Sequence, residues 1–286
     1  MVLESLISPF KAEMRPSKLI FLGFLYSSIA ILLSLWIFKS YASLISVFLT
    51  VMACIPLMYN TIKMEEEKDL QDMGEKWLLK EHRKAVFAFA ALFLGITLAF
   101  TLWYVVLPSE TVSILYETQA QTISNINGNV VGISGNATGS SGIFMKIFFN
   151  NVKVLIFCIL FSFIYGSGSI FILTWNASVI GTAIGSIIRS NLAFYSTLVG
   201  FEKIGKYFTT IMYGLLKFSI HGVFEIGAYI VAGLAGGIIS VAVIKHDFGT
   251  RKFEHILLDS ADLLLLSIAL LFIAGLLEVF ISPVIF

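Results

Sequence analysis

The feature that most constrains this chain is a series of apolar runs, each long enough to cross a lipid bilayer. A helix needs roughly 20 apolar residues to span the hydrocarbon core. Clear runs of this kind lie at residues 19–38, 41–59, 85–107, 152–174, 221–244 and 261–281. Charged residues make up only 13% of the chain, whereas soluble domains carry about 25%. The sequence therefore predicts an all-α, polytopic α-helical integral membrane protein.

The number of spans depends on residues 176–218. Residues 176–199 are long enough to span but contain Arg189 and Asn191. Residues 205–218 are too short to cross, which is typical of a half-helix lying on or dipping into the membrane. We therefore expect six to seven membrane-embedded helices, and we favour a crossing at 176–199 over a re-entrant segment there.

The distribution of positive charge predicts the orientation. The amino-terminal segment contains Lys11, Arg15 and Lys18, and residues 60–84 contain six Lys or Arg, whereas residues 108–144 contain none. Cytoplasmic loops of membrane proteins are enriched in these residues. We expect a multi-pass protein of the cell membrane with a cytoplasmic amino terminus. A net charge of +1 gives no argument for binding nucleic acid.

These patterns divide the chain into three regions. Residues 1–107 form a three-span region with a cytoplasmic charged loop at 60–84, which we interpret as a solvated connector in preference to a partner-docking surface. Residues 108–144 are rich in Gly, Asn and Ser and predict an outer loop or short hairpin. Asn136 begins an Asn-Ala-Thr acceptor pattern there, which makes it a candidate glycosylation site. Residues 145–286 form a carboxy-terminal helical bundle.

Polar groups and glycines gather in this bundle, and we call them the polar stripe. Ionisable groups inside a membrane are functional candidates, but small residues also let helices pack closely. We expect mainly a helix–helix contact, with His221 and Glu225 bonded to an asparagine of a neighbouring helix; a substrate or proton site is the alternative. The polar stripe comprises Asn150, Asn151, Asn176, Gly181, Gly185, His221, Gly222, Glu225, Gly233 and Gly236.

Signals for catalysis are weak. No HExxH pattern occurs, and no predicted span contains the pair of aspartates that an intramembrane aspartyl protease needs. A Ser–His arrangement near Gly166-Ser167-Gly168 stays open, but its motif is unspecific. We therefore predict no catalytic residues, no metal ligands, no cofactor and no enzymatic activity.

The order of several short motifs resembles the stage II sporulation protein M family over about residues 146–286. The motifs are Phe149-Asn150-Asn151, Gly166 with Gly168, Trp175-Asn176-Ala177 followed by Gly181 and Gly185, His221-Gly222-x-x-Glu225, and Ala232-Gly233-x-Ala235-Gly236. The family commonly has Asn-Gly where this chain has Asn176-Ala177. The resemblance implies a polytopic architecture and, by analogy with sporulating members, a scaffold that gathers cell-wall hydrolase subunits without being the hydrolase.

The expected function is therefore a non-enzymatic scaffold or assembly subunit of a membrane complex. Its expected partners are membrane lipids and either other proteins or further copies of itself. The alternative is a permease-like transport subunit in which Glu225 and His221 line a substrate or ion pathway.

Overall fold

The computed structural model describes residues 9–69, 75–134, 140–195, 200–245 and 249–285, and these are helical with no strand among them. The helices, in chain order, are α2 (Pro9–Met14), α3 (Pro16–Ile37), α4 (Ala42–Asp69), α5 (Glu75–Val106), α6 (Ser109–Leu115), α7 (Glu117–Ser134), α8 (Ser140–Tyr165), α9 (Ser169–Phe194), α10 (Gly200–Ile244), α11 (Arg251–Leu276) and α12 (Ser282–Ile285). A 3₁₀ turn at Lys39–Tyr41 joins α3 to α4, and a π-helical turn at Leu277–Ile281 joins α11 to α12.

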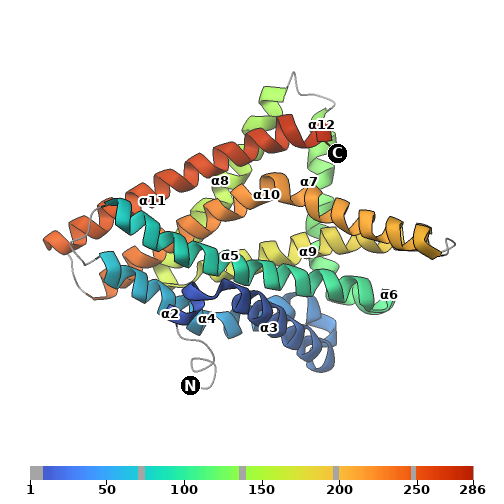
Figure 1. Cartoon of the computed structure of the whole chain (residues 1–286), viewed down its shortest axis with the longest axis horizontal. Coiled ribbons are helices and arrows are strands. Elements are labelled where there is room, and N and C mark those ends of the chain that lie inside the picture. Colours follow the sequence, from blue (N-terminus) through green and yellow to red (C-terminus); the bar gives the residue numbers. More distant parts are fainter. Residues whose placement is uncertain (1–8, 70–74, 135–139, 196–199, 246–248, 286) are drawn as a thin grey trace.

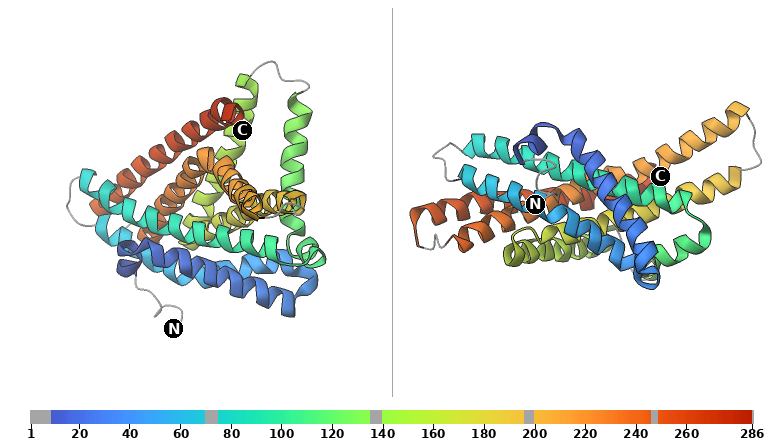
Figure 2. Two further views of the ribbon diagram at one scale, coloured as in Figure 1. Left: turned by 45° about the vertical axis from the view of Figure 1, so that its right-hand side comes forward. Right: turned by 90° about the horizontal axis from the view of Figure 1, so that it is seen from below.

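Seven of the described helices are long and apolar enough to cross a membrane: α3, α4, α5, α8, α9, α10 and α11. This confirms the predicted all-α, polytopic architecture, with the higher of the two expected numbers of spans. The views in Figures 1 and 2 show these helices as one tilted bundle, with α3 on its outer side.

Helix α10 forms the centre of the bundle. It packs against α11, α8, α9 and α4, while α5 packs between α3 and α9. Within its apolar half, the side chains of Tyr229, Ile230, Leu234 and Ile238 are completely buried. The small residues interspersed among them leave little side-chain bulk, so neighbouring helices approach α10 closely.

The predicted single span at residues 152–174 is wrong, because the chain turns in the middle of it. Gly166 adopts φ 68°, a left-handed conformation that favours glycine. A Cβ on Gly168 would lie 2.2 Å from the carbonyl oxygen of Phe161. The Oγ of Ser162 accepts a hydrogen bond of 3.2 Å from the amide of Ser169, the first residue of α9. Two spans, α8 and α9, therefore meet at this turn.

The crossing by α9 places Arg189 at the far end of that helix. Its Nη1 donates hydrogen bonds to the carbonyl oxygens of Tyr104, at 3.0 Å, and Leu107, at 2.8 Å. Its Nη2 donates to Ser109 Oγ at 2.8 Å. These carbonyls end α5, where a cation is favoured by the unpaired oxygens and the helix dipole. Arg189 is thus compatible with a helix that spans.

The half-helix expected at residues 205–218 is not a separate element. It is the first part of α10, which runs unbroken for 45 residues. No proline interrupts this stretch, and proline is the usual cause of a helix break. Figure 1 shows α10 bending near its middle, with its first part running beside the end of α9.

The outer loop expected at residues 108–144 is also wrong over much of its length, because α6 and α7 occupy it. The buried Tyr116 fixes the junction of these helices by donating a hydrogen bond of 2.7 Å to the carbonyl oxygen of Phe100. Gln119 is buried as well and lies between Ser43 and Ser178. Tertiary contacts thus make a helix from a composition typical of loops.

One ion pair places the end of α10 on the same side of the bundle as the end of α4. Lys245 Nζ donates to Glu66 Oε2 at 2.5 Å. This arrangement is the one expected if α9 crosses the membrane. Which side is cytoplasmic stays a prediction.

Candidate functional site: a polar cavity beside α10

The polar stripe is distributed over three helices. Asn150 and Asn151 lie on α8, Asn176, Gly181 and Gly185 on α9, and His221, Gly222, Glu225, Gly233 and Gly236 on α10. The candidate glycosylation site, Asn136, lies outside the described residues.

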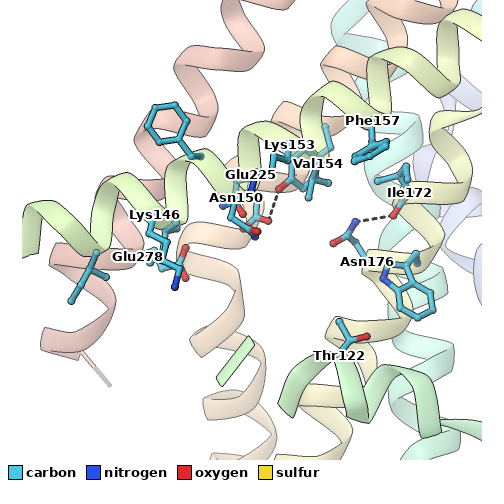
Figure 3. Close-up of a pocket in the computed structure, with 16 residues that line it drawn as sticks. Thr122, Lys146, Asn150, Lys153, Val154, Phe157, Ile172, Asn176, Glu225 and Glu278 are labelled. Atoms are coloured by element: carbon cyan, nitrogen blue, oxygen red, sulfur yellow. Dashed lines mark hydrogen bonds between the residues drawn. The ribbon is translucent and has the colours of Figure 1, made fainter. Parts of the chain in front are cut away.

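A cavity of about 610 Å³ lies between α8, α9, α10 and the π-helical turn after α11 (Figure 3). Its volume falls within the range of small-molecule sites, about 300–1,000 Å³. Its polar and charged lining consists of Thr122, Lys146, Asn150, Asn151, Lys153, Asn176, Glu225, Tyr229 and Glu278. The structure therefore brings together four members of the polar stripe, Asn150, Asn151, Asn176 and Glu225.

The hydrogen bonds differ from those expected for His221 and Glu225. Tyr229 donates from its hydroxyl to Glu225 Oε1 at 2.8 Å, one turn along the same helix. Asn176 Nδ2 donates to the carbonyl oxygen of Ile172 at 2.8 Å, within α9. His221 Nδ1 lies 3.4 Å from Ser282 Oγ. The expected bonds to asparagines are replaced because nearer partners on α9, α10 and α12 are already in reach.

The glycines of α9 face α5, on the side of the helix away from the cavity. A Cβ on Gly181 would lie 2.8 Å from Phe100 Cβ and 2.9 Å from the carbonyl oxygen of Thr97. A Cβ on Gly185 would lie 2.7 Å from Tyr104 Cβ. These contacts leave no room for a side chain, so both glycines set the distance between α9 and α5.

The glycines of α10 divide into two kinds. A Cβ on Gly233 would lie 2.6 Å from Ser169 Cβ, and a Cβ on Gly236 would lie 2.9 Å from the carbonyl oxygen of Ile159. By contrast, no atom lies within 4 Å of the position a Cβ would take on Gly222. The residues of the polar stripe therefore have two roles. Four of its glycines pack closely against neighbouring helices, whereas Gly222 lies with His221 and Glu225 in a more open polar region.

A third ionisable side chain completes this polar region. Glu278, from the π-helical turn, contributes a carboxylate oxygen that lies with donor atoms of His221 and Glu225 in a group spanning no more than 4.8 Å. Sequence reasoning missed Glu278, although an acidic residue within the apolar run at 261–281 is itself a signal of function. Its proximity to α10 depends on the tertiary fold.

The cluster of His221, Glu225 and Glu278 lies far along α10 from the Lys245–Glu66 ion pair. Glu225 precedes Lys245, the residue directly after α10, by 20 residues, which is about 30 Å at 1.5 Å per residue. That length equals the thickness of the hydrocarbon core. The cluster therefore lies far along α10 from Lys245, near the other end of the candidate span at Ser219–Ile244.

A second polar cluster joins α2, α4 and α5, and we call it the charged end: Glu13, Glu65, Lys68 and His82. His82 Nδ1 lies 2.8 Å from Glu65 Oε2, and Lys68 Nζ lies 3.0 Å from Glu13 Oε2. Lys68 also pairs with Glu65. The segment interpreted as a solvated connector thus contains buried, paired charges.

The pKa of Glu13 reflects this environment. Burial, followed by the hydrogen bond and negative charge of Glu65, raises the pKa of Glu13 from 4.5 to about 7, against the opposing effect of Lys68. Glu13 lies before the first span, and its side chain docks α2 onto α4.

Comparison with known families agrees with the sequence resemblance. A family model described as Stage II sporulation protein M matches residues 85–283. The chain belongs to the stage II sporulation protein M family. Comparison with curated proteins and with solved structures gave no match.

The part of the chain shared with the stage II sporulation protein M family is larger than the motifs suggested. It begins at the start of the third predicted span and includes α6 and α7 as well as the carboxy-terminal bundle. Glu225, Glu278 and the cavity between them all lie inside the family region, whereas α3 and α4 precede it.

Proposed function

We propose that this member of the stage II sporulation protein M family is a non-enzymatic scaffold or assembly subunit of a cell-membrane complex. The observation that carries the proposal is the helical order of the charged segment between the second and third spans. Helix α4 continues to Asp69 and α5 begins at Glu75, so most of this segment is helix. Family resemblance adds the scaffold role implied for sporulating members.

The pairing of charges suits a docking surface. Glu65, Glu66 and His82 turn inward and are buried, while Lys63, Glu67 and Arg83 remain exposed on the same two helices. Inward pairing holds the backbone in place, and a partner that binds a preorganised surface loses less conformational entropy on association. We place this surface in the cytoplasm, in line with the positive-inside rule.

The test is recovery of partners from native membranes after reversing the exposed charges. We expect the triple variant Lys63→Glu, Glu67→Lys, Arg83→Glu to lose a co-purifying partner by at least about tenfold, because rim charges control association. The matched control reverses Glu202 and Lys206, which are exposed on the first part of α10.

Mass spectrometry of the purified complexes is the measurement. Equal loss of the partner in the control variant, or a wild-type chain that brings down no stoichiometric partner, would contradict the scaffold proposal.

A permease-like subunit is the second candidate, favoured by the cavity that Glu225 and Glu278 line. A pathway would have to continue for about 30 Å along α10 to reach Lys245 and its partner Glu66. That stretch of α10 contains the tight contacts of Gly233 and Gly236 with neighbouring helices. The scaffold proposal is preferred for this reason; flux measured in proteoliposomes decides between the two.

A further inference from the structure

We propose that His221, Glu225 and Glu278 bind a divalent first-row transition-metal ion, with Zn²⁺ as the representative. The inference concerns only the cluster of these three residues and is independent of the scaffold proposal, which rests on α4 and α5. Residues of two helical segments distant in sequence form the site: α10 supplies His221 and Glu225, and the π-helical turn supplies Glu278.

The geometry of the cluster fits one shared ion. One donor atom from each residue lies within 4.8 Å of the others. Ligands at 2.0–2.2 Å from a tetrahedral zinc lie about 3.3–3.6 Å from one another. Rotation about the side-chain torsions of the two glutamates, which moves each carboxylate oxygen by about 1 Å, brings the three donors to that separation. The spacing of His221 and Glu225, four residues apart on α10, already places both donors on one helix face.

The balance of charge also favours a divalent cation. Glu225 and Glu278 bring two carboxylates together between helices, where unpaired charge is costly. No ion pair joins either carboxylate to a Lys or Arg in the part of the chain that the structure describes, although Lys146 and Lys153 line the same cavity. One divalent ion would neutralise both carboxylates, with a neutral imidazole as the third ligand.

Neighbouring hydroxyls orient the ligands as they do around established metal sites. Tyr229 donates to Glu225 Oε1 at 2.8 Å, which leaves Oε2 for a metal. Ser282 Oγ lies 3.4 Å from His221 Nδ1, which leaves Nε2 as the donor. Partners of this kind fix the orientation of ligating side chains and raise their affinity.

The mixed donor set indicates the class of ion. Imidazole suits zinc and other late first-row metals, and carboxylates suit harder cations, so one His with two Glu selects a first-row divalent ion over calcium. Three protein ligands leave a coordination position open. The cavity of about 610 Å³ reaches Glu225 and Glu278 and provides the space for water or a small ligand at that position.

The test measures zinc on the purified full-length chain, carrying a tag without histidines. After chelation and removal of the chelator, the protein is titrated with Zn²⁺ against a fluorescent competitor, and bound zinc is counted by elemental analysis. We expect one zinc per chain, at least about tenfold weaker binding in Glu278→Gln and in His221→Ala, and unchanged binding in the controls Glu110→Gln and His255→Ala. Both control side chains are exposed and distant in sequence from the cluster.

Thermal unfolding with and without Zn²⁺ keeps the result interpretable if a variant folds poorly. Zinc should raise the Tm of wild type by several degrees and leave that of Glu278→Gln unchanged, because an ion that binds only the folded state stabilises it. The metal site is overturned if the titrated wild type binds no zinc. It is also overturned if wild type and His221→Ala bind zinc equally. None of these results bears on partner recovery through α4 and α5.

Discussion

At the scale of single residues, the chain places its charges according to what surrounds them. Arg189 lies where carbonyl oxygens at the end of α5 need donors. Lys245 reaches Glu66 across the bundle. Glu13, which precedes the first span, docks beside Lys68 and Glu65. In each case a side chain that hydropathy alone marks as unfavourable contributes a specific tertiary contact.

Glu13 makes docking of α2 sensitive to pH. Because its pKa in the folded protein, about 7, lies above the ordinary value of 4.5, the folded state binds the proton more tightly. Its contribution to stability is complete below about pH 4.5 and is lost as the pH rises through 7. We therefore expect Glu13→Gln, which resembles the protonated form, to be more stable than wild type at pH 8 and nearly equal to it at pH 5.

Thermal unfolding in detergent at the two pH values measures this effect, with the exposed Glu110→Gln as the control. A difference between Glu13→Gln and wild type that is the same at both pH values would show that the proton on Glu13 is not involved.

At the scale of elements, helix boundaries depend on individual backbone contacts more than on apolar length. The break between α8 and α9 falls at Gly166 and Gly168, inside a run that hydropathy presents as continuous. Helix α10 continues through the stretch where hydropathy suggests two pieces. Periodicity identifies the helices, but the turn geometry decides where each one ends.

Helix packing can be tested by adding one methyl group at two glycines. Gly181→Ala should lower the free energy of unfolding by about 1–3 kcal/mol, the usual cost of overpacking a well-packed core, because the new Cβ meets Phe100 and the backbone of Thr97. Gly222→Ala should be neutral or slightly stabilising, since its Cβ meets no atom within 4 Å and alanine favours helix.

Unfolding by a denaturing detergent, followed by circular dichroism, compares the two variants. Equal stability of Gly181→Ala and Gly222→Ala would mean that the α9–α5 contact is looser than the structure shows.

At the scale of the whole molecule, the seven spans and the Lys245–Glu66 pair define one topology. The ends of α4 and α10 share one side, and the end of α5 lies on the other side with the end of α9. With the amino terminus in the cytoplasm, Arg251 would face the cytoplasm and Glu110 would face outward. The orientation itself is the part that charge distribution predicts.

Labelling of one introduced cysteine at a time in intact cells checks this orientation. We expect a membrane-impermeant maleimide to label Glu110→Cys but to label Arg251→Cys only after the cells are permeabilised; both positions are exposed. The native Cys54 and Cys158 are buried and serve as the internal background. The reverse pattern would invert the proposed orientation and move the charged end outside.

The sequence by itself determined that the chain is an α-helical membrane protein, because the length of apolar runs is a local property of the chain. The order of short motifs also indicated the family. The sequence also located His221 and Glu225 as unusual, since two ionisable groups one turn apart are visible without a fold. It mistook residues 108–134 for a loop, because the contacts that hold α6 and α7, such as the Tyr116 hydroxyl on Phe100, join segments that only folding brings together.

Only the tertiary structure decided the composition of the site. Glu278 is 53 residues from Glu225 along the chain, and packing of α11 on α10 places their carboxylates together. The same packing separates the glycines, which hold helices together, from the polar groups, which line a cavity. Local pattern shows which residues are costly to place in a membrane, but the partner that offsets that cost comes from another helix, and the fold alone selects it.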